Sequence, residues 1–95
     1  MQFLTISRRK DGVEAPGNDL VREEAQRARM FYAEGLMRQL WHRGDGPGAC
    51  VLWEVEDEDQ LWELLKSLPF FRAEMVDVSV IPLRPWAGFA PEKAS

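Results

Sequence analysis

The sequence predicts a single α+β domain in which strands and helices follow the order βαββαβ. Three observations support this order: four short apolar runs, two segments with helical periodicity, and glycine- or proline-rich breaks between them. Of the 95 residues, 45% are hydrophobic and 11% are aromatic, which excludes a disordered chain. The length leaves no room for a second core. We expect one domain over residues 1–84 and a tail over residues 85–95 that packs on a neighbouring subunit.

The first two elements are a strand and an amphipathic helix. Residues 2–8 mix apolar and β-branched side chains, which favours a strand, and residues 10–19 contain two glycines and a proline, which favours a loop. Asn18 or Asp19 can cap the helix that follows, and Gly35 can end it. Spacings of four, three and four predict its buried face, formed by Val21, Ala25, Ala28 and Tyr32.

The middle of the chain predicts a hairpin, since the short apolar runs 36–43 and 49–55 flank a loop with three glycines and a proline. Asp57 and Gln60 then form a pattern typical of a capping box at a helix start. The helix is marked by a stripe of Leu61, Leu64, Leu65 and Leu68, and we expect Pro69 to end it. The alternating run 75–83 predicts the fourth strand.

This order is that of the ferredoxin-like fold, in which two helices cover one face of a four-stranded antiparallel sheet. Both faces of the predicted sheet are apolar. In the third strand, for example, Val51 and Trp53 point to one side while Cys50 and Leu52 point to the other. One pair of helices cannot cover both faces, so we expect a homo-oligomer, at least a dimer.

Composition narrows the possible functions. Acidic residues outnumber basic ones by 16 to 12, and the net charge of −4 argues against a nucleic-acid partner. One Cys and one His exclude an intrachain disulfide and the usual zinc spacings, and no apolar stretch is long enough to span a membrane. No signal-peptide pattern opens the chain, so we expect a cytoplasmic protein.

Several short motifs resemble those of the muconolactone isomerase family. The stretch 34–41, Glu-Gly-Leu-Met-Arg-Gln-Leu-Trp, is similar to the family's helix-ending glycine and its Arg-x-Leu-Trp strand. Trp53-Glu54-Val55 is similar to its aromatic-acid-Val, residues 67–71 to its Leu-Pro-Leu-Phe, and residues 77–80 to its closing Asp-Ile-x-Val strand. The resemblance covers approximately residues 23–83 and the opening strand.

The resemblance implies a dimeric α+β barrel, often assembled into rings of dimers, with a pocket beside each sheet. It also implies a cofactor-independent isomerase or cyclase-like enzyme that shifts a proton in an unsaturated lactone or small ring, in aromatic catabolism or secondary metabolism. Alternatives are a cofactorless monooxygenase of aromatic polyketides and a non-catalytic small-molecule-binding or assembly protein. The chain departs from the family in having an apolar third strand and Arg84-Pro85-Trp86 in place of a His-Pro, which suggests a different substrate or lost isomerase activity.

A proton shift needs a base, and the sequence offers two candidates, His42 and Glu54. His42 is the only imidazole, at the end of the second strand, although it can equally be an exposed strand-end residue. Glu54 lies in an apolar strand, and a carboxylate that faces a dry pocket becomes a plausible base. The alternative is a Glu54 that points outward from an alternating strand.

Substrate binding is assigned to five other residues, and packing is the alternative for the three aromatic ones. Arg38, which matches the family arginine, can bind a carboxylate or pair with Glu54 or Asp77 across the sheet. Tyr32 is placed on the inner helix face, where it can donate a hydrogen bond into the pocket. The aromatic walls and a further acid of the predicted site are Trp41, Trp53 and Asp77.

Overall fold

The computed structural model describes residues 1–91 and confirms the predicted order of elements, with one short helix added. The helices α1 and α2 are the two that the sequence predicts. A third, the single turn α3, follows α2 and is not predicted by the sequence. The elements are β1 (Gln2–Arg9), α1 (Asn18–Ala33), β2 (Met37–His42), β3 (Ala49–Glu54), α2 (Glu58–Lys66), α3 (Pro69–Arg72), β4 (Val76–Leu83) and the 3₁₀ turn η1 (Ala87–Phe89).

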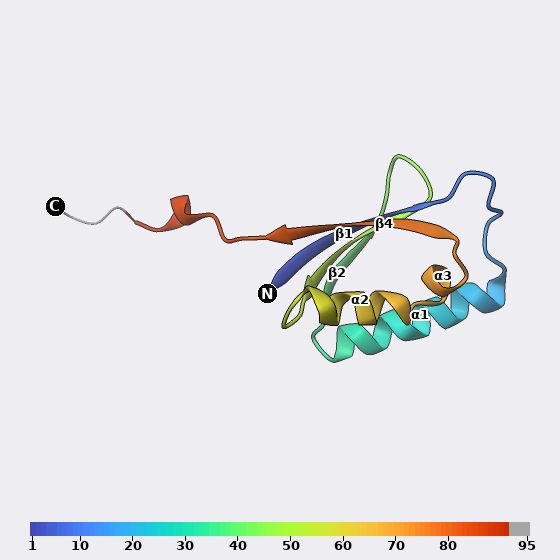
Figure 1. Cartoon of the computed structure of the whole chain (residues 1–95), viewed down its shortest axis with the longest axis horizontal. Coiled ribbons are helices and arrows are strands. Elements are labelled where there is room, and N and C mark those ends of the chain that lie inside the picture. Colours follow the sequence, from blue (N-terminus) through green and yellow to red (C-terminus); the bar gives the residue numbers. More distant parts are fainter. Residues whose placement is uncertain (92–95) are drawn as a thin grey trace.

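The four strands form one antiparallel sheet in the order β2-β3-β1-β4. Thr5 in β1 is the centre of the register, opposite Val51 of β3 and Val80 of β4. Figure 1 shows the helices together on one side of this sheet, which leaves the other side uncovered. The ferredoxin-like α+β fold expected from the sequence is therefore confirmed.

The core lies between the sheet and the helices, and its largest side chains are Trp53, Phe3 and Leu61, each at most 1% exposed. Phe31 of α1 packs edge-on against Trp53, with ring centroids 5.8 Å apart. The inner face of α1 thus ends with Phe31, and the assignment of Tyr32 to that face is wrong, since Tyr32 is 68% exposed. A helix turns by about 100° per residue, so Glu24, Ala28 and Phe31 lie on one side of α1, and the buried face is rotated away from the predicted stripe. Val21, at the start of that stripe, is likewise 45% exposed.

The helix ends agree with the sequence only in part. Neither Asn18 nor Asp19 caps α1, because the N-cap is Gly17 and no side chain bonds there. At α2 the expected capping pair is present: Asp57 Oδ1 accepts a hydrogen bond from Gln60 N at 2.8 Å, and Gln60 Oε1 accepts one from Glu56 N at 2.7 Å. Pro69 follows the end of α2 and also opens α3, where a proline's missing N–H costs nothing.

Removing the cap of α2 is expected to lower stability without changing the fold. In an Asp57→Ala variant the N–H of Gln60 loses its side-chain acceptor and the positive end of the helix loses a carboxylate. We expect a loss of about 1 kcal/mol in the free energy of unfolding, measured by urea denaturation. Asp57→Asn keeps the acceptor and should recover most of that loss, whereas equal losses in both variants would contradict the capping role.

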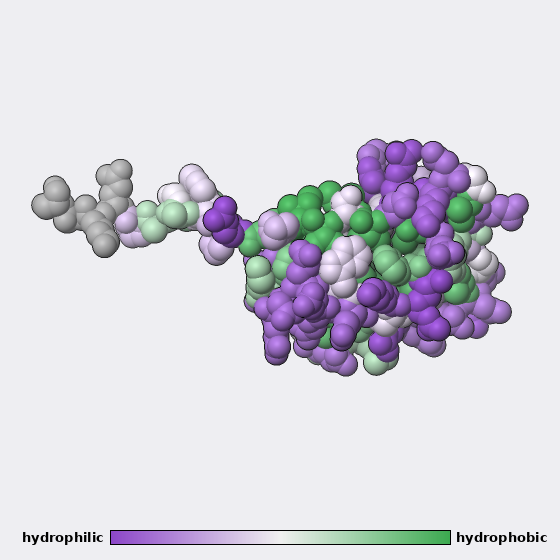
Figure 2. All heavy atoms as spheres, viewed as in Figure 1, coloured by the Kyte–Doolittle hydropathy of each residue, from purple (hydrophilic) through white to green (hydrophobic). Residues whose placement is uncertain are grey.

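The uncovered side of the sheet is apolar. Trp41 and Ile81 are 47% and 39% exposed there, and the partly exposed Leu4, Ile6 and Leu52 lie between them. Figure 2 shows hydrophobic surface along this side of the sheet, away from the helices. The prediction that a second subunit covers it stays a prediction.

Beyond β4 the described part of the tail runs away from the body of the domain, as Figure 1 shows. Trp86 and Phe89 stack edge-on with centroids 4.5 Å apart, yet they are 68% and 86% exposed. Their packing on a neighbouring subunit also stays a prediction. The last four residues of the predicted tail, 92–95, lie outside the described residues.

Candidate functional site

A cavity of about 600 Å³ lies between the inner face of the sheet and helices α1 and α3. Trp53 and Val51 of β3 and Met37 of β2 line it from the sheet, and Ala25 and Ala28 line it from α1. These side chains reach the same space because residues two apart in a strand, and three or four apart in a helix, share a face. The walls are thus mainly apolar, as in most small-molecule sites.

Two hydroxyl groups on the sheet side of the cavity are held by hydrogen bonds. Thr5 Oγ1 accepts a bond from Trp53 Nε1 at 2.9 Å, which fixes the plane of the indole. Ser7 Oγ accepts from Ala49 N at 3.0 Å and donates to Ala49 O at 3.3 Å, which ties β1 to the start of β3. The buried Trp53 N–H is therefore satisfied, and Thr5 keeps a hydroxyl proton that it can donate.

Glu24 of α1 is the one carboxylate that lines the cavity within the described chain. It lies one helical turn before Ala28, and its Oε1 accepts a hydrogen bond from Phe70 N at 3.0 Å. Burial raises the pKa of Glu24 above its ordinary value of 4.5, while the bond from Phe70 partly opposes this shift. A carboxylate that is fixed in position and has a raised pKa is suited to act as a general base.

The mouth of the cavity carries a different set of groups. Arg9 and His42 lie at the ends of β1 and β2, and Arg29, in the last third of α1, adds a second guanidinium to the lining. Gly48 closes this end of the hairpin with φ +152°, and a side chain there would collide with the carbonyl oxygen of Ser7. The hairpin therefore lies directly on β1, and the mouth combines positive charge with an imidazole.

The structure places two of the seven residues assigned from the sequence in this cavity, His42 and Trp53. Glu54 lies on the opposite face of the sheet, where its Oε2 is 3.4 Å from the N-terminal nitrogen of Met1. Trp41 lies opposite Cys50 in the register and shares that outer face. His42 and Glu54 therefore do not converge on one pocket.

The remaining three assigned residues are exposed and do not line the cavity: Arg38, Tyr32 and Asp77. Arg38 sits at a β-bulge between Met37 and Gln39, which interrupts the alternation of β2. Among the described residues, Arg38 forms no ion pair with Glu54 or Asp77. The cross-strand pairing considered for Arg38 is thus not present in this chain.

Sequence reasoning missed Glu24, and a signal for it exists. Glu24 lies three residues after Val21 and four before Ala28, so it belongs to the same helical face as the predicted apolar stripe. A carboxylate within an apolar stripe points toward a core or a pocket rather than toward solvent. Arg9 and Arg29 carry no comparable signal, because their positions depend on how the loop and α1 meet the sheet.

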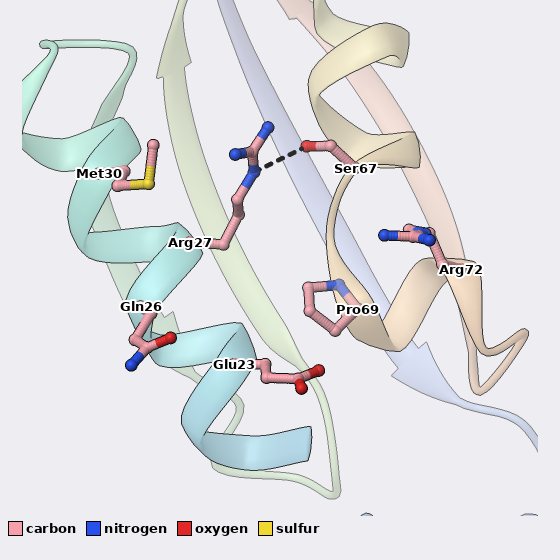
Figure 3. Close-up of a pocket in the computed structure, with 7 residues that line it drawn as sticks. All are labelled: Glu23, Gln26, Arg27, Met30, Ser67, Pro69 and Arg72. Atoms are coloured by element: carbon pink, nitrogen blue, oxygen red, sulfur yellow. Dashed lines mark hydrogen bonds between the residues drawn. The ribbon is translucent and has the colours of Figure 1, made fainter. Parts of the chain in front are cut away.

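A second cleft of about 360 Å³ lies between α1 and the α2–α3 segment (Figure 3). Arg27 lies in this cleft and makes two contacts there. Its Nε donates a hydrogen bond to Ser67 Oγ at 3.2 Å, and its guanidinium lies 5.0 Å from the centre of the Phe31 ring. Glu23 and Arg72 line the same cleft with opposite charges. These contacts join α1 to the end of α2, so the cleft is explained by helix packing.

Among residues 1–91, no helix combines the length and apolarity required to cross a bilayer. Within the same range, no three His, Cys, Asp or Glu side chains gather in a way that could hold a metal ion.

Solved structures with this arrangement of elements include two enzymes. A crystal structure of muconolactone isomerase matches with a TM-score of 0.78 at 21% identity, covering 100% of both chains. The 5-chloro-2-hydroxyhydroquinone dehydrochlorinase of Burkholderia phenoliruptrix AC1100, in complex with 2,5-dihydroxybenzoquinone, matches with a TM-score of 0.60 at 20% identity, covering 88% of this chain and 94% of that one. At these identities the likeness establishes the fold alone.

Sequence comparison assigns the family. None of the curated proteins matches the chain. The family model described as muconolactone delta-isomerase, however, matches residues 3–87, which includes every strand and helix that lines the cavity. The resemblance found in the short motifs of the sequence is thereby confirmed, and the chain belongs to the muconolactone delta-isomerase family.

Proposed function

We propose that this protein is a cofactor-independent isomerase that shifts a proton within an unsaturated ring substrate, with Glu24 as the base. The observation that carries the proposal is the position of Glu24, a carboxylate on the wall of an apolar cavity with its pKa raised by burial. Family membership supports an isomerase-like reaction on a small molecule. Glu54, the other carboxylate considered, is on the far face of the sheet.

The reaction balances without an oxidant. The Glu24 carboxylate removes a proton from a carbon conjugated with a carbonyl group, and the electron pair left behind spreads onto the carbonyl oxygen as a dienolate. The lining contains three groups that can donate a hydrogen bond, His42, Arg29 and Thr5 with its free hydroxyl proton, and each is a candidate to stabilise that oxygen. The protonated Glu24 then returns the proton to a different carbon, and the double bond moves.

We also propose that the working form is a homo-oligomer built on the uncovered face of the sheet. Trp41, Ile81 and their apolar neighbours form a continuous exposed surface there, and a second copy can cover it by packing sheet to sheet. The cavity lies on the other face, so such an interface leaves its walls unchanged.

The direct test is exchange of substrate hydrogen in D₂O. Wild-type protein is incubated with an unsaturated lactone acid and, separately, with hydroxyquinones, and NMR follows the loss of carbon-bound protons. The proposal expects protein-dependent exchange and double-bond migration with no oxygen consumed. Oxygen uptake without isomerisation would favour a cofactorless monooxygenase, and binding without either reaction would favour a non-catalytic binding protein.

A further inference from the structure

The size and polarity of the cavity define a class of substrate for the proposed isomerase. We infer that the cavity takes a fused-ring compound of two or three rings, apolar along its length and with one polar or anionic end. This inference rests on the proposed function for the reaction but on the cavity alone for the ligand. It departs from the compact lactone or single ring expected from the sequence.

The volume of the cavity is larger than a one-ring compound fills. A water molecule takes about 30 Å³ in the liquid, so a cavity of about 600 Å³ corresponds to roughly twenty non-hydrogen atoms. A one-ring lactone fills only about half of such a space and leaves apolar walls in contact with water. The volume depends on two small side chains of α1, Ala25 and Ala28, which stand opposite the sheet.

The lining of the cavity runs along a whole strand of the sheet. It extends along β2 from Met37 to His42, which at about 3.3 Å per residue is roughly 17 Å of strand. Trp53 lies opposite Met37 at the inner end, and Ala49 lies opposite His42 at the outer end. A space that is long and bounded by the flat face of a sheet fits an extended planar ring system.

The distribution of polar groups along the cavity is a further argument. Arg9 and His42 lie at the end where β1 and β2 finish, whereas the opposite end carries the buried Trp53, Met37 and Leu65. Two further charged residues line the cavity: Glu24, whose carboxylate accepts the bond from Phe70 N, and the exposed Arg29. The inner polar pair, Thr5 and Trp53, is already joined by a hydrogen bond. A ligand that matches this distribution has apolar rings inside and an oxygen-bearing or anionic group at the mouth.

Calorimetric titration of the wild-type protein with a graded series tests the inference. The series consists of benzoate, 2-naphthoate and anthracene-2-carboxylate, with one, two and three rings and the same carboxylate group. Each added ring buries further apolar surface, so we expect the dissociation constant to fall by about tenfold per ring. Equal affinity along the series, or tightest binding of the single ring, would overturn the inference.

A matched pair of variants assigns the effect to the cavity. Ala28→Leu adds three carbons at the wall and should weaken binding of the three-ring ligand by tenfold or more while it leaves the one-ring ligand nearly unchanged. Ala33→Leu makes the same change at an exposed position of α1 and should change neither. Ala25→Leu serves in place of Ala28→Leu if circular dichroism shows that the latter does not fold. Three-ring affinity that both cavity variants retain would place the ligand elsewhere and contradict the inference.

The two proposals fail in different ways. Tight binding of the three-ring ligand, with no proton exchange in the lactone acid or the hydroxyquinones, would refute the isomerase and leave the substrate class standing. Proton exchange confined to a lactone acid, with weak binding of every fused ring, would refute the substrate class and leave the isomerase standing.

Discussion

A Glu24→Gln variant is expected to lose proton exchange by a factor of about 10²–10⁴, the range that a general base contributes. The amide keeps the shape of the side chain and can still accept the hydrogen bond from Phe70 N, but it cannot take a proton from carbon. The measurement is the deuterium exchange rate per active site. In the wild type the rate should rise with pH as Glu24 ionises, with a midpoint above 4.5, and this dependence should vanish in the variant.

The same variant separates catalysis from stability through the sign of the pKa shift. A carboxyl group whose pKa is raised on folding stabilises the folded state while it is protonated, and that contribution is lost as the pH rises through the raised pKa. Above that raised pKa the ionised Glu24 is therefore a cost to folding. We expect Glu24→Gln to unfold at the same temperature as the wild type or at a higher one.

Two control variants test whether position matters. Glu23→Gln removes the neighbouring carboxylate, which is exposed and lines the other cleft, and Glu54→Gln removes the carboxylate on the outer face. Both should keep the exchange rate within about threefold of the wild type, as expected for groups away from the chemistry. Loss of exchange in Glu54→Gln but not in Glu24→Gln would reverse the assignment.

Truncation of Leu61 is expected to cause a large loss of stability without touching the cavity lining. Leu61 is 0% exposed and lies in the core with Trp53 and Leu65. Leu61→Ala removes buried carbons and leaves a void, which costs about 2–5 kcal/mol. A domain of this size has roughly 5–15 kcal/mol in total, so the midpoint of urea denaturation should fall steeply.

Leu40→Ala is the matched control for that change. Leu40 is 43% exposed on the edge strand β2, and its truncation should cost less than about 1 kcal/mol. Equal losses in the two variants would contradict the placement of the core between the sheet and α2.

Local rules account for the parts of the fold that the sequence predicted. The order of elements follows from periodicity and breaks, and the start of α2 follows from the Asp57 capping pattern. The start of α1 does not, since its N-cap is a glycine without a side chain to bond. The short helix α3 depends on Leu68 packing into the core next to Pro69, which is a tertiary effect.

The site was harder to predict because it depends on which face of each element points inward. In β3 the alternation that turns Val51 and Trp53 toward the helices also turns Glu54 away from them. An outward-pointing Glu54, the alternative considered from the sequence, was therefore already implied. In α1 the step from Ala28 to Phe31 rather than to Tyr32 shifts the inner face by one position. Arg9 and Arg29 line the cavity only because β1 and α1 pack against each other in the folded domain.

The hydrogen bond between Glu24 and Phe70 links the position of a proton to the order of a wall. An ionised carboxylate accepts a stronger hydrogen bond than a protonated one, so the first turn of α3 is held more firmly while Glu24 is charged. Phe70 and Phe71 of that turn are part of the cavity lining. In the proposed proton shift we therefore expect this wall to be held most firmly before the proton leaves the substrate and least firmly while Glu24 carries it, at the step where the intermediate must present a second carbon.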